Sequence, residues 1–286
     1  LMLHGMNKQA NQDLRLIDVA KSMAAAGFRV VFPSYPIIAQ HLIDIGCVDE
    51  FAATIRIMTA DKTLCPSGQT GVFTASFSGA ILFRALGYPD VAEKVSSVCG
   101  IGVCCYARTI LYNMLNEATD DYYAKCITLK NLHKIAGHLT PTREKAFSLA
   151  IDDSFSADSQ WTQVRGFVET EIPEMQPVLR RLIDKVESQA PMSELYEAEI
   201  DLLADEFFTP NLSAIRCPIS LIHSEGDTVL HTVESEMLFK DLKKAGVSTN
   251  LVITPLFDHA DFKFSIKYLK QGLQLIHAFH YFFRAV

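Results

Sequence analysis

The sequence predicts an α/β fold: a mainly parallel, doubly wound sheet with helices on both of its faces. Short apolar runs alternate with amphipathic stretches over residues 1–104 and again over 211–286, which is typical of parallel strands joined by right-handed crossovers. A β-prone run also ends at Ser76 and continues at once in small residues that start a helix. We therefore expect one α/β core with Ser76 at the carboxyl edge of its sheet.

The core elements follow one another in the order that such a fold requires. An amphipathic helix carries Leu14 and Ile17 on its apolar face and stops at Gly27. A second helix near 49–60 places apolar residues at helical spacing. Strands are expected at 1–3, 28–32, 71–75, 94–103, 219–223 and 249–254, and further helices at 232–245 and 264–283.

Residues 105–210 interrupt this alternation. No strand pattern is present there, while tyrosine, methionine and acidic residues recur at helical spacing. We interpret this segment as a helical lid inserted into a single core made of residues 1–104 and 211–286. Its apolar side chains would suit an acyl chain, and packing of the lid onto the core would explain them equally well.

Composition narrows the class of protein. The 286 residues are 49% hydrophobic, which is enough for a sizeable core. A net charge of −7 without a basic cluster argues against nucleic acid as a partner. The longest apolar run, 98–107, is about half of a membrane span, so no transmembrane segment is expected. Seven cysteines without a C-x-x-C pair indicate reduced thiols and a cytoplasmic location. Composition leaves the oligomeric state open.

Three residues that follow expected strands have the chemistry of a catalytic triad. Ser76 follows the strand 71–75, Asp227 comes after 219–223, and His259 comes after 249–254. The carboxyl ends of parallel strands share one edge of the sheet, so these side chains should meet there. A serine hydroxyl needs a neighbouring base, and the base needs an acid that orients it. We predict Ser76 as the nucleophile, His259 as the general base and Asp227 as the acid.

Two neighbouring residues offer alternatives within this scheme. Ser78 could be the nucleophile, because Thr74 stands where this type of turn usually has glycine. We prefer Ser76, since Ser78 begins the helix, where it would pack or cap. Asp258 could be the acid, but neighbouring side chains point apart in an extended backbone, which separates it from His259.

The pair His4-Gly5 follows the first expected strand. With this pair and the three triad candidates in the same order along the chain, the sequence resembles the α/β-hydrolase superfamily over nearly its whole length. The resemblance implies the α/β-hydrolase fold and assigns the pair to the family's oxyanion turn. It also implies that the backbone N–H groups of Met6 and Phe77 form the oxyanion hole, each worth about 3 kcal/mol in the transition state.

A narrower resemblance concerns the substrate. Residues 74–78, with their Ala-Ser-Phe-Ser core, are similar to the acyltransferase, or myristoyl-acyl-carrier thioesterase, of bacterial luminescence systems. Residues 48–51 and 102–103 resemble that family in order and spacing. The resemblance implies an ester or thioester with an apolar acyl chain as substrate, and it adds an acyl carrier as a partner.

We therefore expect a serine hydrolase that cleaves a carboxylic ester or thioester without a metal or cofactor. A non-catalytic ligand-binding protein on the same scaffold, an amide, peptide or C–C bond hydrolase, and an acyltransferase remain open. We expect His4 to hold its turn by hydrogen bonding and His223 to be structural. His277 and His280 are three residues apart without a third ligand nearby, which favours packing over metal binding.

Overall fold

The computed structural model describes residues 1–115, 122–155, 160–183, 191–207, 210–258, 261–262 and 269–286. The chain divides into two compact units. The first, called the α/β unit below, comprises Leu1–Tyr106 and Phe207–Val286. The second, the helical unit, comprises Ala107–Glu206.

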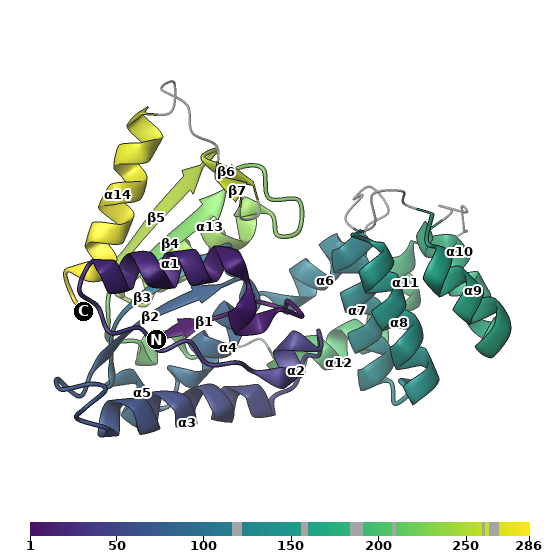
Figure 1. Ribbon diagram of the computed structural model, residues 1–286, viewed down its shortest axis with the longest axis horizontal. Helices are drawn as coiled ribbons and strands as arrows, with labels where there is room; N and C mark the ends of the chain where they lie inside the picture. Colours follow the sequence, from purple (N-terminus) through teal and green to yellow (C-terminus); the bar gives the residue numbers. More distant parts are fainter. Residues whose placement is uncertain (116–121, 156–159, 184–190, 208–209, 259–260, 263–268) are drawn as a thin grey trace. The chain divides into compact units, whose positions relative to one another are not determined.

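A five-stranded parallel sheet forms the centre of the α/β unit (Figure 1). Its strands lie in the order β1-β2-β3-β4-β5, and every neighbouring pair is parallel. This topology confirms the predicted α/β class with a parallel, doubly wound sheet. The strands are β1 (Met2–Leu3), β2 (Thr70–Ala75), β3 (Val95–Ile101), β4 (Ile219–Ser224) and β5 (Thr249–Thr254).

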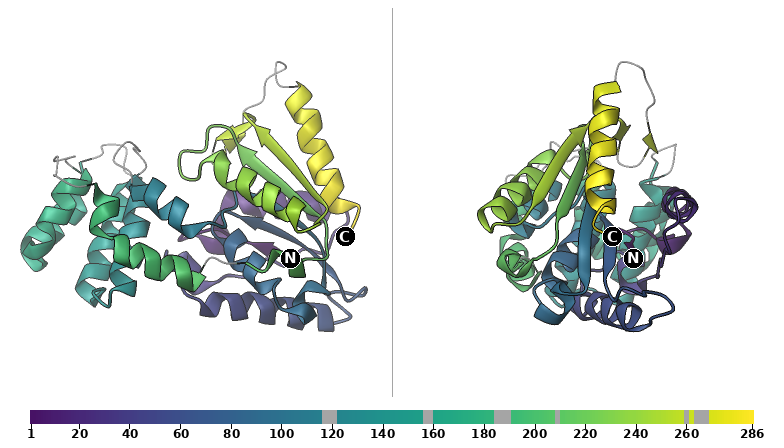
Figure 2. Two further views of the ribbon diagram at one scale, coloured as in Figure 1. Left: turned by 180° about the vertical axis from the view of Figure 1, so that it is seen from behind. Right: turned by 90° about the vertical axis from the view of Figure 1, so that its left-hand side faces the viewer.

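Helices cover both faces of this sheet (Figure 2). Alternate strand residues, among them Phe73 and Ile222, join Met23 of α1 (Leu14–Ala25) and Phe282 of α14 (Leu269–Phe283) in one buried cluster. The next residue of β4, His223, points to the opposite face and contacts α13 (Thr232–Lys244). On that face α4 (Ser78–Ala85) packs on β2, and α3 (Gly46–Ala60) packs on α4.

The strand predicted at 28–32 is wrong. The segment makes one main-chain hydrogen bond to β1, in which the Met2 N–H donates to the Val31 carbonyl at 2.8 Å. No ladder follows, because β1 is only two residues long. The alternating residues Phe28, Val30 and Phe32 nevertheless pack onto the cluster under α1 and α14. The alternation over 28–32 therefore predicted correctly which side chains are buried, but the segment does not form a strand.

The remaining elements of the α/β unit are short. Two one-turn helices, α2 (Pro36–Ala39) and α5 (Pro89–Ala92), begin at proline. An antiparallel pair, β6 (Phe257–Asp258) and β7 (Asp261–Phe262), follows β5. The last helix, predicted from residue 264, begins at Leu269, and residues 263–268 lie outside the described part of the chain.

The described residues of the helical unit contain helices and no strand. Its centre is α7, in which every residue from Ala124 to His133 is buried. Thr140 caps the next helix by accepting a hydrogen bond from the Arg143 N–H, and Pro141 occupies its first turn. No described helix of either unit is long and apolar enough to span a bilayer. The helices are α6 (Ala107–Leu115), α7 (Tyr122–Ile135), α8 (Pro141–Asp153), α9 (Thr162–Glu171), α10 (Gln176–Ile183), α11 (Met192–Leu195) and α12 (Glu197–Phe207).

Candidate active site

Ser76 occupies a sharp turn between β2 and α4. Its backbone has φ of +55°, the left-handed region that side-chain-bearing residues rarely adopt. Such a conformation costs about 1–3 kcal/mol and persists only where the surroundings hold it. Here the Ser76 N–H donates to the Ile101 carbonyl at the end of β3 at 2.9 Å, and the Ser76 carbonyl accepts from the Gly79 N–H at 3.0 Å. This strand–serine–helix turn is the arrangement on which the α/β-hydrolase fold is built.

The two residues that depart from the usual glycine pattern flank this turn. Thr74 is completely buried in β2. Ser78 is also 0% exposed, and its hydroxyl donates a short hydrogen bond to the His4 carbonyl. That hydrogen bond commits the Ser78 hydroxyl to holding the neighbouring turn, which favours Ser76 over Ser78 as the nucleophile.

The turn after β1 lies directly against Ser76. A methyl group added at Gly5 would come within 3.1 Å of the Ser76 Cβ and 3.3 Å of the Ala75 carbonyl oxygen. A residue with a side chain would therefore push the two turns apart. His4 is buried, donates from Nδ1 to the Gly5 carbonyl at 2.8 Å and accepts at Nε2 from the Tyr35 N–H at 3.0 Å. This is the hydrogen-bonding role predicted for His4.

The protonation state of His4 follows from its surroundings. Burial lowers its pKa, and the hydrogen bond to the Gly5 carbonyl offsets part of this effect. The ring is therefore neutral at pH 7, with its proton on Nδ1, because Nε2 must accept from the Tyr35 N–H. A neutral ring that is bonded on both sides fixes the turn and leaves no nitrogen to act as a second base.

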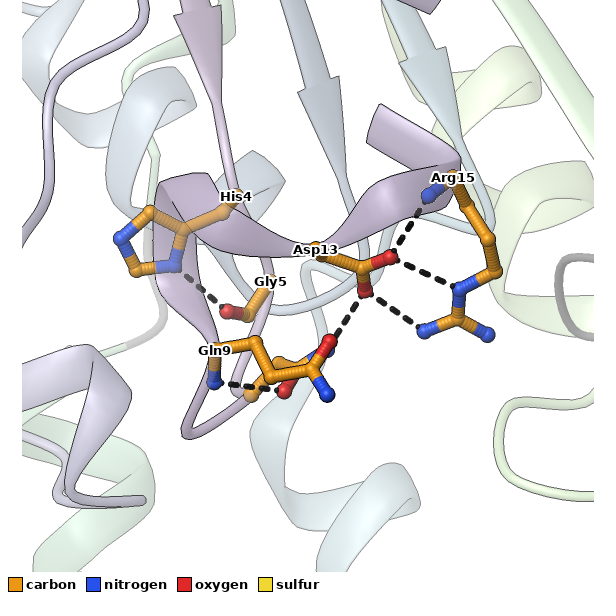
Figure 3. A network of polar contacts seen from close by, with 6 residues as sticks. His4, Gly5, Gln9, Asp13 and Arg15 are labelled. Atoms are coloured by element: carbon orange, nitrogen blue, oxygen red, sulfur yellow. Dashed lines mark hydrogen bonds and ion pairs between the residues drawn. The ribbon is translucent and has the colours of Figure 1, made fainter. Parts of the chain in front are cut away.

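A network of polar contacts anchors the loop that continues to α1 (Figure 3). Asn7 Nδ2 donates to Asp13 Oδ2 at 2.6 Å, and Asn7 Oδ1 accepts from the Gln9 N–H at 2.9 Å. Asp13 caps α1 by accepting from the Arg15 N–H at 3.0 Å, and the Arg15 guanidinium adds bonds of 3.0 and 2.7 Å. Burial alone would raise the pKa of Asp13, but the hydrogen bonds and charge of Arg15 outweigh burial and lower it. The loop that carries Met6 is thus fixed at both ends.

Asp227 stands in the turn after β4, on the same edge of the sheet. Its side chain is 5% exposed, and Oδ1 accepts from the N–H groups of Val229 and Leu230 at 2.9 Å each. Gly102, after β3, has φ of +52°, and a methyl group there would lie 3.3 Å from Asp227 Oδ2. Because Ser76 bonds to Ile101 and Asp227 lies over Gly102, the two candidates flank the end of the same strand.

The structure describes four of the five predicted site residues. Ser76, Phe77 and Met6 are on the two adjoining turns, and Asp227 follows two strands further along the sheet. The N-terminus of α4 begins at Ser78, so its positive end faces the serine and favours a developing negative charge. His259 lies between β6 and β7 in the sequence and is outside the described residues.

Sequence reasoning missed Glu234, in the first turn of α13. Its side chain is 1% exposed, and burial raises its pKa to about 7, an effect that the Tyr106 backbone N–H reduces. Cys104 and Cys105, the residues just after the end of β3, are also buried. In the sequence, Glu234 is an acidic residue in the first turn of a helix, which is a common exposed position. No sequence signal therefore indicates that Glu234 is buried.

The cysteines and the two histidines near the C-terminus, for which no metal site was predicted, lie in the described part of the chain. Within that part, all seven cysteines are buried and form no disulfide. His277 and His280 lie on α14, and the part of the chain that is described contains no group of three or more His, Cys, Asp or Glu residues able to hold a metal ion.

Comparisons with known proteins find solved structures of similar fold. No protein-family model matches the sequence, and no curated protein gives a significant sequence match. A thermophilic esterase from Thermogutta terrifontis is similar over 99% of this chain and 88% of its own, with 13% identity and a TM-score of 0.49. A monoacylglycerol lipase from Paleococcus ferrophilus is similar over 98% and 92%, with 14% identity and a TM-score of 0.47. An esterase from Pyrococcus furiosus is similar over 99% of this chain and 81% of its own, with 11% identity and a TM-score of 0.48. At these identities and TM-scores, the likeness says nothing about the chemistry of this chain.

Proposed function

We propose that this chain is a serine hydrolase that cleaves carboxylic esters or thioesters through an acyl-enzyme. The observation that carries the proposal is the backbone of Ser76, held at φ of +55° between a strand and a helix with Gly5 packed against it. Strained backbone of this kind clusters at active sites, where the surrounding structure holds it in place. The carboxylate of Asp227, at the same edge of the sheet, supplies the acid that such a serine requires.

The proposed mechanism has two steps. His259 takes the proton from Ser76 Oγ as the oxygen attacks the carbonyl carbon, and the backbone N–H groups of Met6 and Phe77 hold the oxyanion. Collapse of the tetrahedral intermediate expels the alcohol or thiol, which receives its proton from His259. A water molecule then repeats the sequence on the acyl-Ser76 ester and releases the carboxylic acid. Asp227 keeps the imidazole in the required tautomer and stabilises its cation.

For the substrate we propose a medium or long apolar acyl group. This part rests on the resemblance of residues 74–78 to the luminescence acyltransferase and thioesterase family, which also suggests an acyl carrier as the donor of the thioester. Transfer of the acyl group to an alcohol would use the same acyl-enzyme. That residues 105–210 serve as a lid stays a prediction.

Labelling with a fluorophosphonate tests the nucleophile. We expect one adduct per chain, located on Ser76 by peptide mass spectrometry, and none in Ser76→Ala. Ser78→Ala is the matched control, because it removes a hydroxyl two residues away and should still be labelled on Ser76. An unlabelled wild type would favour the non-catalytic ligand-binding alternative, and an adduct on Ser78 would move the nucleophile.

A series of p-nitrophenyl esters from acetate to palmitate tests the acyl group. We expect kcat/KM to rise towards the longer chains, and a matching acyl-carrier thioester to be cleaved as well. Equal rates along the series, or a preference for acetate, would contradict the apolar acyl group while leaving the nucleophile in place. An acyl anilide in the same assay separates ester from amide hydrolysis.

A further inference from the structure

A second buried histidine lies directly behind the acid. His223 is in β4, and its side chain is 0% exposed. Nδ1 lies 2.7 Å from the Ser235 hydroxyl oxygen on α13, and Nε2 lies 2.8 Å from the Leu230 carbonyl oxygen. Nε2 is also 3.6 Å from Asp227 Oδ2. Nε2 therefore contacts the turn that carries the acid, and Nδ1 contacts the helix that follows it.

These partners determine where the ring carries its hydrogen. A carbonyl oxygen can only accept, so Nε2 is the donor to Leu230. With the ring hydrogen on Nε2, Nδ1 accepts the hydroxyl hydrogen of Ser235, so the approach of Ser235 Oγ to the Val103 carbonyl is a packing contact and not a second hydrogen bond. The Nε2 hydrogen bond goes to the Leu230 carbonyl, and Asp227 Oδ2 lies beside the same nitrogen at 3.6 Å. His223 thus links the turn of the acid to α13, through Leu230 on one side and Ser235 on the other.

The same contacts continue towards the nucleophile. Ser235 Oγ lies 3.4 Å from the Val103 carbonyl oxygen. The Val103 side chain fills the space beside Gly79, where an added methyl group would meet it at 2.5 Å. Gly79 in turn donates its N–H to the Ser76 carbonyl. A continuous series of packed and hydrogen-bonded residues therefore connects the turn of Ser76 to His223 and Asp227.

We propose that His223 is a positioning residue that holds the turn 227–230 so that the Asp227 carboxylate keeps one orientation towards the catalytic base. The inference rests on the proposed function, since it assigns His223 to the acid of that triad. His223 touches no reacting atom and acts only through Asp227. Its loss should therefore lower kcat and leave KM unchanged, because a displaced carboxylate weakens the transition state and not substrate binding.

Substitution of His223 tests the proposal. His223→Leu removes both ring nitrogens, and we expect kcat for ester hydrolysis to fall about tenfold to a hundredfold with KM within about twofold of wild type. His223→Gln restores an amide donor towards the Leu230 carbonyl and should recover most of that loss. Ser235→Ala, which removes the partner of Nδ1, should give an intermediate kcat.

Ser220→Ala provides the matched control. Ser220 is in the same strand and fully buried, but it faces α14 and bonds to the Ala278 carbonyl at 3.0 Å. Its loss removes one buried hydroxyl of β4 without touching the turn of the acid, so kcat should stay at the wild-type value. Melting temperatures of all variants distinguish a variant that has lost its fold from a folded variant in which the Asp227 carboxylate is displaced. If His223→Leu does not fold, His223→Gln and Ser235→Ala decide the question.

A double-mutant cycle with Asp227→Asn provides the decisive readout. If His223 acts through Asp227, adding His223→Leu to Asp227→Asn causes no further loss of kcat. A folded His223→Leu with wild-type kcat, or an equal loss in both backgrounds, would overturn the positioning role. A wild type that is neither labelled on Ser76 nor active on any ester overturns the proposed function itself, whereas an active wild type with an indifferent His223 overturns this inference alone.

Discussion

The turn after β1 and the turn after β4 both present a group at the carboxyl edge of the sheet, but they are held differently. At His4-Gly5 the close approach of backbones and a neutral ring between two main-chain groups fix the turn. At Asp227 the turn is fixed by the N–H groups of Val229 and Leu230, which donate to the carboxylate. The buried side chains of His223 and Ser235 support it from behind. The first turn is sensitive to added volume, and the second is sensitive to lost polar atoms.

The largest expected effect is on the acid side. Asp227→Asn keeps an oxygen that accepts from the N–H groups of Val229 and Leu230, so the fold should persist. Without the carboxylate the base loses its tautomer, and kcat should fall by about 10⁴-fold. Steady-state kinetics with a p-nitrophenyl ester measures this loss. Asp241→Asn, which removes a carboxylate from α13, should leave kcat near wild type, and equal losses in both would contradict the role of Asp227.

The pH dependence of stability tests a second buried polar group near the turn of Asp227, the carboxyl of Glu234 on α13. The pKa of Glu234 is raised in the folded state from 4.5 to about 7, so the folded chain binds the proton more tightly than the unfolded chain. The contribution of Glu234 to the free energy of unfolding should therefore fall by about 3 kcal/mol as pH rises from about 4.5 to about 7. His133, whose pKa burial lowers to about 4, contributes in the opposite direction, so the effect of Glu234 is measured as the difference between wild type and a variant. Urea unfolding of Glu234→Gln should show a gain of that size at pH 8 and little change at pH 4.5.

The exposed Glu225 provides the control for this measurement. Glu225→Gln removes a carboxyl from the turn after β4 without removing a buried one, so its stability should follow wild type at every pH. A difference between wild type and Glu234→Gln that is the same at pH 4.5 and pH 8 would show that Glu234 is solvated in the folded state.

Added volume tests the other side of the comparison. Gly5→Ala places a methyl group 3.1 Å from the Ser76 Cβ, so one of the turns must move by a few tenths of an ångström. We expect kcat to fall by about tenfold, since small displacements at a nucleophile have large effects on rate. Gly166→Ala, in α9, adds the same methyl group where nothing lies within 4 Å. An unchanged kcat in Gly5→Ala would show that the two turns separate without consequence.

The smallest expected effect concerns the anchor of the loop that carries Met6. Asp13→Ala removes the N-cap of α1 and the hydrogen bond from Asn7, which should lower the free energy of unfolding by about 1 kcal/mol. Urea unfolding measures the change. Asp18→Ala, an exposed position on the same helix, should change stability by less than about 0.5 kcal/mol.

Residues whose position follows from the chain direction could be predicted. Ser76 and Asp227 come directly after apolar runs, so their place at the carboxyl edge follows once the strands are parallel. His223 and Glu234 could not be assigned in the same way. The pattern of β4 indicates that His223 is buried, but its partners come from α13 and the turn at 230, which packing alone brings together.

The expected strand at 28–32 failed for a related physical reason. Its alternation of apolar residues is real, and Phe28, Val30 and Phe32 pack as a strand would. Strand assignment, however, requires a ladder with a neighbour, and the two-residue β1 supplies one bond at Met2. Side-chain period reports burial, whereas backbone pairing depends on the length of a partner elsewhere in the sequence.

The α/β unit is assembled from two stretches of chain that are separated by the whole helical unit. During synthesis, β1, β2 and β3 leave the ribosome long before β4, which pairs with β3, and before α14, which covers Phe73 and Cys99. The nascent chain therefore passes through a stage with an unpaired sheet edge and an open apolar surface, a combination that favours aggregation and recruits chaperones. Fragments that end before residue 219 should consequently be insoluble when expressed alone.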